Sequence, residues 1–420
     1  MRFTFDDTEY HARPGDTLAA ALLRNGVRIV ARGPYTGRPR GVYGIGAEEP
    51  NAYLHVESGG GETMLRATQI EVYDGLRARS LSGKGILGTE PDTRRYDHTH
   101  THCDVLVVGA GPAGLAAALA AGASGARVIL ADEQPTLGGA QVGLDEWVAQ
   151  SGALLAGMPE TRVLTRTTVT GYYDHNYLVA VERRTDHLAD PPAHLARQRL
   201  WHIRAGQVVL ATGAHERPIA FCDNDRPGIM LAGAAAAYAR RFGVPPGRRA
   251  VVFGAHDGAR EAARDLADAG VDIAAMVDVR DGRGVVGTDA NADGALAAAL
   301  VAPLDAAGRP AGEPKRIPCD LLAVSGGWNP AVHLFSQSGG KLAWSEEIAS
   351  FEPSVSAQRE TSVGAAHGTF DLTAALSQGA EAGVRAAEAT GFSSPGVAVP
   401  SVGQARVYGG AVEVRRRVGE

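Results

Sequence analysis

Cysteine is scarce in this sequence. Its three cysteines, Cys103, Cys222 and Cys319, lie far apart, and no two of them form a CxxC pair. Disulfide scaffolds, zinc sites and iron–sulfur clusters with four thiolate ligands all need several closely placed cysteines. The spacing therefore argues against each of these within this chain alone.

Long apolar runs and an excess of positive charge are missing as well. No segment reaches the roughly 18 consecutive apolar residues of a membrane-spanning helix, and the N-terminus, MRFTFD, does not resemble a signal peptide. The formal net charge of −6 gives no electrostatic reason to expect nucleic acid or an anionic membrane as a partner. We therefore predict a cytoplasmic protein that binds neither.

Glycine and alanine are abundant, which suits close packing of helices on a sheet. The chain has 420 residues, 54 of them glycine, and is long enough for two or three domains with separate cores. Its central motif is VLVVGAGPAG at residues 105–114, followed by an alanine-rich run. A buried strand, a glycine turn and a helix in this order are typical of a dinucleotide-binding unit.

Each glycine of this motif has a physical role. Gly109 makes the turn, Gly111 lets the backbone approach a pyrophosphate, and Gly114 allows the helix to pack closely on the strand. Pro112 and Ala113 begin the helix, whose free N–H groups and positive end attract phosphate.

Later turns at strand ends extend this predicted ligand cradle. An apolar strand at residues 127–131 ends in Asp132 and Glu133, where a carboxylate can bind the ribose hydroxyls of adenosine. A second glycine pair, in LGG at 137–139, and the small-residue turn ATG at 211–213 offer further backbone N–H groups to phosphates.

A second strand–turn–helix unit begins at residue 248 and includes AVVFGAHDGARE at 250–261. His256 occupies the place of the middle glycine, so its side chain obstructs a pyrophosphate. We predict a Rossmann domain that keeps its architecture and has lost nucleotide binding.

The N-terminal residues predict a separate small domain. Strands at 1–5, 8–11 and 53–57 and a helix at 17–25, capped by Asp16 or Thr17, resemble the plant-type ferredoxin (β-grasp) fold. The loop that would hold the cluster, residues 44–52, contains no cysteine, so we expect the fold without its iron. The connector that follows has one predicted strand, at residues 67–73.

Two groups of ionisable residues have simple structural explanations. The segment HTHTHC at 98–103 places three histidines on one side of an extended chain, but no fourth ligand or second shell is evident, so we favour an exposed lead-in strand over a metal site. His215, Glu216 and Arg217 follow the ATG turn, and we favour a loop salt bridge there over acid–base chemistry. No catalytic residue is assigned.

The predicted fold class is α/β, a glutathione-reductase-like flavoprotein architecture of two dinucleotide-binding domains preceded by a β-grasp domain. A glycine turn near residue 364 and a helix at 372–389 return the chain to the first nucleotide domain. We predict a β-grasp domain at 1–75, a connector at 76–102, the first nucleotide domain at 103–218 and 326–395, an inserted second domain at 219–325, and a loose tail at 396–420.

Motifs along nearly the whole chain give it a specific resemblance. It is similar to the N-terminal half of the α subunit of heterotetrameric sarcosine oxidase and, more distantly, to cyanide synthase, opine oxidase and heteromeric L-proline dehydrogenase subunits. The motifs are RPRG at 38–41, EEPNA at 48–52, HCDVLVVG at 102–109, ADEQP at 131–135, ATGAHERP at 211–218, NDRPGIML at 224–231, SGGWNP at 325–330 and GTF at 368–370.

The resemblance implies an oxidoreductase subunit that holds a dinucleotide at Gly109–Gly114 and helps to enclose FMN against a β-type flavoprotein subunit, with smaller subunits as further partners. Oxidation of a small amine then takes place on FAD in that partner. The family contacts carry over to Gly109, Gly111, Ala113, Gly114, Asp132, Glu133, Gln134, Ala140, Val169, Gly213 and Thr369. Pro112, Gly139, Ala211, Thr212, Gly364 and Phe370 complete the predicted cofactor-binding set.

Which dinucleotide is bound, and for what purpose, depends on finer features. The terminal turn GAAH at 364–367 has no carboxylate before Asp371 to hold a ribityl chain, so we predict NAD, with FAD as the alternative. Asp132 and Glu133 disfavour NADP, because like charges about 4 Å apart repel by roughly 4 kcal/mol at an effective dielectric near 20. The family's folate-binding domain has no counterpart in this sequence, so neither folate use nor sarcosine as substrate is predicted.

Two other hypotheses stay open. One is a self-sufficient FAD- and NADH-dependent oxidoreductase, against which His256 and the scattered cysteines count. The other is a non-catalytic scaffold whose bound nucleotide only stabilises the fold.

Overall fold

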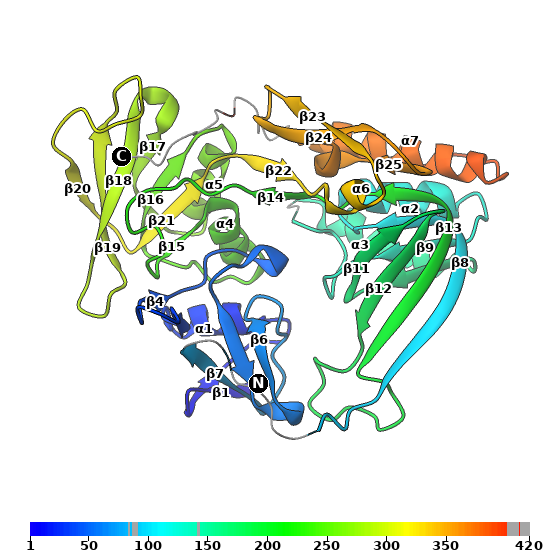
Figure 1. The fold of residues 1–420 in the computed structure, drawn as a ribbon, viewed down its shortest axis with the longest axis horizontal. Coiled ribbons are helices and arrows are strands. Elements are labelled where there is room, and N and C mark those ends of the chain that lie inside the picture. Colours follow the sequence, from blue (N-terminus) through cyan, green and yellow to red (C-terminus); the bar gives the residue numbers. More distant parts are fainter. Residues whose placement is uncertain (83–84, 86–90, 141–142, 401–410, 412–420) are drawn as a thin grey trace.

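The computed structural model describes residues 1–82, 85, 91–140, 143–400 and 411. Figure 1 shows three units: an N-terminal domain in blue, a first nucleotide domain that combines cyan and green strands with the orange C-terminal part, and a second domain in green and yellow. The strands of one sheet therefore come from segments far apart in the chain. The predicted α/β fold class is confirmed, and along the chain the second domain lies between two parts of the first nucleotide domain.

The N-terminal domain has the predicted β-grasp order of elements. Its sheet runs β2-β1-β7-β3-β4, with β5 on β7 and β6 on β5. Thr17 caps the helix, since its Oγ1 accepts the Ala20 N–H at 3.3 Å. The elements are β1 (Arg2–Phe5), β2 (Thr8–His11), α1 (Leu18–Arg24), β3 (Ala31–Arg32), β4 (Pro39–Arg40), η1 (Gly46–Glu48), β5 (Tyr53–Val56), η2 (Ser58–Gly60), β6 (Glu62–Arg66) and β7 (Leu76–Ser82).

The strand predicted at residues 67–73 is wrong. These residues form turns, because their carbonyls serve the start of α1: Leu18 N–H donates to Ile70 O at 2.8 Å and Ala19 N–H to Ala67 O at 2.9 Å. The strand comes later, as β7, which pairs with β1 in parallel and with β5 in antiparallel fashion. The N-terminal sheet thus continues past the boundary that we placed at residue 75.

The first nucleotide domain is built on a sheet of order β10-β9-β8-β13-β12-β11, with β25 paired to β13. Strands β10, β9, β8, β13 and β25 are parallel, and β12 and β11 continue the sheet as antiparallel strands. The elements are β8 (Tyr96–Val108), α2 (Pro112–Gly122), β9 (Val128–Ala131), α3 (Asp145–Ala156), β10 (Thr161–Leu164), β11 (Thr167–Tyr173), β12 (Tyr177–Arg183), β13 (Gln198–Leu210), α6 (His333–Gln337), β23 (Lys341–Ser345), β24 (Ser350–Val355), β25 (Glu360–Ser362), η4 (Gly364–His367) and α7 (Leu372–Ala389).

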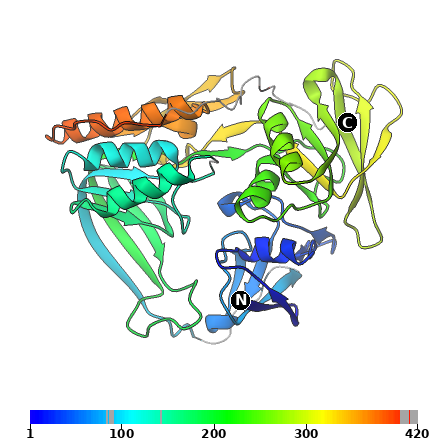
Figure 2. The same ribbon diagram turned by 180° about the vertical axis from the view of Figure 1, so that it is seen from behind.

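Helices α2 and α7 touch backbone to backbone. A Cβ at Gly379 would lie 2.1 Å from Ala113 O, and one at Gly383 would lie 2.2 Å from Ala117 O. Only glycine permits this approach. Figure 2 shows α7, in orange to red, lying along the cyan α2. The C-terminal helix therefore covers the helix of the central motif, with the bounds that the sequence predicted.

The histidines of β8 form part of an exposed strand, as expected. The rings of His100 and His202, on neighbouring β8 and β13, stack with centroids 4.4 Å apart, and His98 meets both edge-on. Within the part of the chain that the structure describes, no group of three His, Cys, Asp or Glu side chains is arranged to hold a metal ion.

The second domain repeats the strand–turn–helix unit on a sheet of order β15-β21-β16-β17, beside a three-stranded sheet β18-β19-β20. Two short antiparallel strands, β14 and β22, connect the first nucleotide domain to the second domain (Figure 1). The elements are β14 (Ala214–Glu216), β15 (Ile229–Leu231), α4 (Ala232–Arg241), β16 (Arg249–Gly254), α5 (Gly258–Asp268), β17 (Asp272–Asp278), η3 (Val279–Asp281), β18 (Arg283–Ala290), β19 (Leu296–Pro303), β20 (Lys315–Pro318), β21 (Leu321–Ser325) and β22 (Trp328–Pro330).

The N-terminal and second domains share one hydrophobic core. Leu18 and Leu22 of α1 and Tyr238 of α4 are fully buried members of a single cluster that also includes Val252 of β16. Buried apolar area of this kind makes the two domains one packed body. Most of the predicted loose tail, 396–420, lies outside the described residues.

Candidate functional site

The turn after β8 has the geometry of a phosphate cradle. Gly109 has φ +99°, and a Cβ there would lie 2.3 Å from Ala211 O. A Cβ on Gly114 would lie 1.8 Å from Gly109 O, whereas a Cβ on Gly111 would meet nothing within 4 Å. Two of the glycines are therefore required by packing, and the third faces open space at the N-cap of α2. The N–H groups of this helix start fit a pyrophosphate.

Asp132 closes the same turn from the end of β9. Its Oδ2 accepts the Ala110 N–H at 2.5 Å, and its Oδ1 accepts the Gln134 N–H at 2.7 Å. Burial raises the pKa of Asp132 above its ordinary value, while these two N–H groups oppose the rise. Each oxygen keeps a lone pair, so the carboxylate can shape the turn and still accept a ribose hydroxyl.

Two arginines near the acid pair were missed by the sequence reasoning. Arg183 of β12 donates to Glu133 O at 3.1 Å and to Gln69 O of the N-terminal domain at 3.0 Å. Arg241, at the end of α4, donates to Thr136 Oγ1 at 3.0 Å and lies in the field of Asp132. No local motif marks either residue, because both arrive from elements distant in the sequence.

The remaining predicted residues take several positions. Gly139 and Gly364 pack against the cradle. A Cβ added at Gly139 would lie 3.0 Å from Gly111 Cα, and one added at Gly364 would lie 2.9 Å from Ala113 Cβ. Thr369 N–H donates to Gly364 O at 3.0 Å, with Phe370 next in the chain. Gly213, at φ +75°, leaves open space in front of it.

The other members lie at the margins of the cradle. Thr212 Oγ1 donates to Ala331 O at 2.9 Å, which gives its side chain a structural task. Val169 lies two residues after Thr167, whose N–H donates to Asp132 O at 2.7 Å, so β11 starts beside the acid turn, residues 132–134. Ala140 is exposed and Val169 is partly buried.

The linker strand β14 holds a buried acid. Glu216 Oε2 accepts the Gly233 N–H at 2.8 Å, at the start of α4. Burial raises the pKa of Glu216 to about 8. Beside it, His215 Nδ1 lies 3.7 Å from Glu48 Oε2 of the N-terminal domain, and this carboxylate raises the pKa of His215. The triplet thus connects the three units of the molecule.

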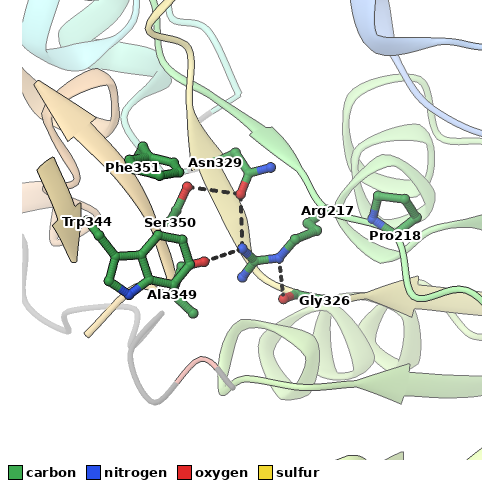
Figure 3. Close-up of a pocket in the computed structure, with 8 residues that line it drawn as sticks. All are labelled: Arg217, Pro218, Gly326, Asn329, Trp344, Ala349, Ser350 and Phe351. Atoms are coloured by element: carbon green, nitrogen blue, oxygen red, sulfur yellow. Dashed lines mark hydrogen bonds between the residues drawn. The ribbon is translucent and has the colours of Figure 1, made fainter. Parts of the chain in front are cut away.

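Arg217 is held in place by acceptors from two other segments, as Figure 3 shows. Its Nε donates to Gly326 O at 2.9 Å, and its Nη1 donates to Asn329 Oδ1 at 3.0 Å and to Ala349 O at 2.6 Å. These contacts border a pocket of about 300 Å³ lined by Arg217, Pro218, Gly326, Asn329, Trp344, Ala349, Ser350 and Phe351. Trp344 and Phe351 are 38% and 53% exposed, so the rim is aromatic and open.

The turn of the second domain is filled by its own side chain. His256 is fully buried, with Nε2 at 2.7 Å from Ser325 Oγ, and its Nδ1 accepts the Gly258 N–H at 3.1 Å. Burial lowers the pKa of His256 to about 4. The imidazole therefore accepts an N–H group at the start of α5 that a phosphate would otherwise accept. Asp278, at the end of β17, is paired with Arg260 and Arg280.

Comparison with known families matches two ranges of the chain. Residues 1–83 match the family described as "2Fe-2S iron-sulfur cluster binding domain", and residues 103–302 match "Pyridine nucleotide-disulphide oxidoreductase". The first range includes β7 and agrees with its place in the N-terminal sheet.

Two curated relatives and one solved structure align with nearly all of the chain, and a further relative aligns with part of it. The alpha subunit of sarcosine oxidase from Corynebacterium sp. (strain P-1) is 47% identical over 93% of the chain and 43% of the relative, and that from Rhizobium meliloti (strain 1021) is 37% identical over 96% and 47%. One subunit of opine oxidase from Agrobacterium tumefaciens (strain Ach5) is 34% identical over 42% of the chain and 36% of the relative. The L-proline dehydrogenase of P. horikoshii, at 23% identity and a TM-score of 0.73, covers 94% of the chain and 74% of its own, and shows the fold.

Proposed function

The chain is a homologue of sarcosine oxidase alpha subunits along 93% of its length, and from this premise we propose that it is the nucleotide-binding alpha-type subunit of a heteromeric, flavin-dependent amine oxidase or dehydrogenase. It spans less than half the length of the relatives it matches, 43% in one case. The activity, the amine and the partners of the whole enzyme are therefore part of the proposal.

The observation that carries the proposal is the contrast between the two glycine turns. Gly111 leaves open space at the start of α2, and His256 closes the corresponding place at α5. One dinucleotide site is thus available where a self-sufficient NADH-dependent flavoprotein would need two. The three cysteines are also too dispersed for a redox dithiol, and Cys103 and Cys319 are buried.

The residues fit a dinucleotide in one orientation. The N–H groups at Gly111 and the first turn of α2 hold the pyrophosphate, and Asp132 accepts from the adenosine ribose. A bound dinucleotide supplies hydride-transfer chemistry, or structural support where no donor reaches it. We favour NAD over FAD, because η4 presents no carboxylate before Asp371, and Asp371 caps α7 by accepting the Ala374 N–H at 2.8 Å.

The finer part of the proposal concerns FMN and a β-type partner. An enclosed flavin needs a second protein surface, and the pocket beside Arg217 offers an open aromatic rim, formed by Trp344 and Phe351. Large exposed aromatic side chains are typical of contact surfaces. Amine oxidation is assigned to the partner chain, as in the family that the sequence resembles, and none of the residues that line the pocket beside Arg217 is a carboxylate or a histidine.

Heat release and identification of the bound nucleotide test the proposal most directly. Stoichiometric NAD is expected; FAD would reverse our choice of dinucleotide, NADP would refute the charge argument at Asp132 and Glu133, and no nucleotide at all would refute the site. The purified chain should contain no iron or acid-labile sulfide, because no cysteine precedes Cys103. An iron-to-protein ratio of about two, as in a [2Fe–2S] protein, would contradict this.

A second experiment distinguishes the proposed role from that of a self-sufficient enzyme. The chain alone should not reduce a dye with sarcosine, proline or opines, and co-expression with its β-type partner should restore amine-dependent reduction. Steady reduction by the chain alone, surviving further purification, would overturn the assignment. A substitution at Gly111 that prevents nucleotide binding can then be tested in the complex. Retained amine oxidation would mean that the nucleotide only stabilises the fold.

A further inference from the structure

Loop 44–52 of the N-terminal domain, where a cluster-binding relative would place its thiolates, lies against the first nucleotide domain. A carboxylate organises it from within. Glu49 is 1% exposed, and its two oxygens accept four backbone N–H groups, from Tyr43, Gly44, Asn51 and Ala52, at 2.6–2.9 Å. Charge-assisted bonds of this kind are about twice as strong as neutral ones, so the loop is rigid without a metal.

The apex of this loop touches the acid turn after β9. Gly46 has φ +61°, and a Cβ there would lie 3.2 Å from Gln134 Nε2 and 3.8 Å from Glu133 Oε1. Thr68 Oγ1 donates to Gly46 O at 2.6 Å and fixes the apex from behind. The loop therefore stands directly beside the turn to which the proposed site assigns the adenosine ribose.

The other end of the apex touches the segment that follows β13. Glu48 Oε2 accepts the Glu216 N–H at 3.2 Å and lies 3.7 Å from His215 Nδ1. The ends of β9 and β13 flank the end of β8, and ligands of open α/β sheets bind along this carboxyl edge. One loop thus spans the edge from the acid turn to the residues beyond Gly213.

We infer that loop 44–52 forms the outer wall of the dinucleotide site, and that Glu48 positions His215 to contact the bound dinucleotide. The inference rests on the proposed nucleotide site and adds a third domain to it. Glu48 acts through His215 and through the linker backbone, so it is a positioning residue. Glu49 holds the wall in shape.

The charges around His215 favour its protonated form. Glu48 raises the pKa of His215, Glu133 adds to the rise, and burial opposes it. His333 of α6 meets the ring edge-on at 5.6 Å, and Glu216 and Arg217 follow it in the chain. A protonated imidazole favours a dinucleotide pyrophosphate, and this gain is lost as the pH rises through the raised pKa of His215.

Titration of the full-length chain with NAD, and separately with FAD, from pH 5.5 to 8.5 tests the wall. Glu48→Gln should weaken the binding of the preferred dinucleotide about tenfold near pH 6.5, and should move the fall in affinity to lower pH. His215→Gln should remove that pH-dependent fall while leaving the loop in place. Unchanged affinity and an unchanged pH profile in both variants would overturn the inference.

Glu62→Gln is the matched control for loosened domain docking. Glu62 of β6 pairs with Arg197, which directly precedes β13 and so lies at the end of that strand opposite to Gly213. Its loss should change affinity less than about twofold; an equal loss in Glu62→Gln and Glu48→Gln would show that docking alone matters. If the wild-type chain binds neither dinucleotide at any pH, the proposed function fails and not only the wall.

Discussion

The two strand–turn–helix units of this chain differ at one position that decides what each can bind. In the first, Gly111 faces open space, and the start of α2 keeps its N–H groups for a ligand. In the second, the imidazole of His256 lies at that place, bonded to Gly258 N–H and Ser325 Oγ. A buried side chain has replaced the phosphate as partner of the helix start. The same fold therefore leaves a helix start open for the proposed ligand in one domain and fills it with a packed side chain in the other.

Converting the first turn into the second should have the largest effect. In Gly111→His the new side chain enters the space of the pyrophosphate, so nucleotide affinity should fall by at least about 1,000-fold, roughly 4 kcal/mol. Folding should change little, because a Cβ at Gly111 meets no atom within 4 Å. Calorimetric titration and circular dichroism measure the two effects.

Gly111→Ala is the control, and it should retain more binding than Gly111→His because its side chain is smaller. Tight binding by Gly111→His would show that the dinucleotide lies elsewhere.

Opening the second turn should destabilise the protein without creating a second site. His256→Ala leaves the Gly258 N–H unpaired in the core and removes buried volume, so unfolding free energy should fall by about 2–4 kcal/mol in urea. Ser325→Ala, which removes only one partner, should cost less.

Nucleotide stoichiometry should stay at one in His256→Ala, because Asp278 remains engaged by Arg260 and Arg280. A second equivalent of nucleotide would mean that His256 alone had blocked the site.

Cutting the tie between the two units should have an intermediate effect. Arg217→Ala removes hydrogen bonds to Gly326, Asn329 and Ala349, so stability should drop by about 2 kcal/mol. Assembly with the partner should fall more than turnover of the assembled enzyme. Arg217→Lys should recover little, because an ammonium group cannot reproduce the planar fork. A selective loss of turnover would give Arg217 a direct role in chemistry.

The smallest effect should be a pH dependence at the linker. The pKa of Glu216 is about 8 in the folded chain against an ordinary 4.5. Between these values the folded protein holds a proton that the unfolded chain has released, so stability falls as the pH rises from 4.5 to 8. Glu216→Gln should flatten this fall by on the order of 1–3 kcal/mol in denaturant titrations across that window.

Glu57→Gln provides the opposite control for Glu216. Arg79 lowers the pKa of Glu57, so its contribution is present at neutral pH and is lost only in acid. The fall above pH 4.5 should therefore persist in Glu57→Gln. A flat profile in the wild type would contradict a buried, protonated Glu216.

Sequence reasoning predicted most of the fold where local pattern and tertiary role agree. Helix α7 and strand β2 match their predicted ranges, and the glycines of the central motif have the packing that their spacing implied. It failed where tertiary contacts decide. Residues 67–73 were predicted as a strand, yet their carbonyls accept hydrogen bonds from the start of α1. Strand β7 alternates polar and apolar residues, but it lies in a segment that was predicted as a connector.

Only the glycines of the central motif and the acid after β9 could be predicted as parts of the candidate site. Glycines and the acid after a strand can be recognised by their spacing, because one βαβ unit supplies them all. Arg183 reaches the site through the strand order of its own sheet, and Arg241 and Glu48 reach it from the other two domains. The motif EEPNA at 48–52 contributes to the family resemblance, but its sequence does not indicate which surface Glu48 faces.

The close contact between α2 and α7 has a consequence for the order in which the molecule is made. Ala113 and Ala117 of α2 meet Gly379 and Gly383 of α7 across a sequence separation that includes the whole inserted domain. On the ribosome, the inserted domain emerges complete while the nucleotide domain still lacks its covering helix. The face of α2 that α7 covers in the folded protein therefore stays exposed in the nascent chain until α7 has been translated. Folding of this domain is late, because it depends on the closure of a long loop. Ribosome-stalled chains ending before and after α7 should differ sharply in protease resistance at α2.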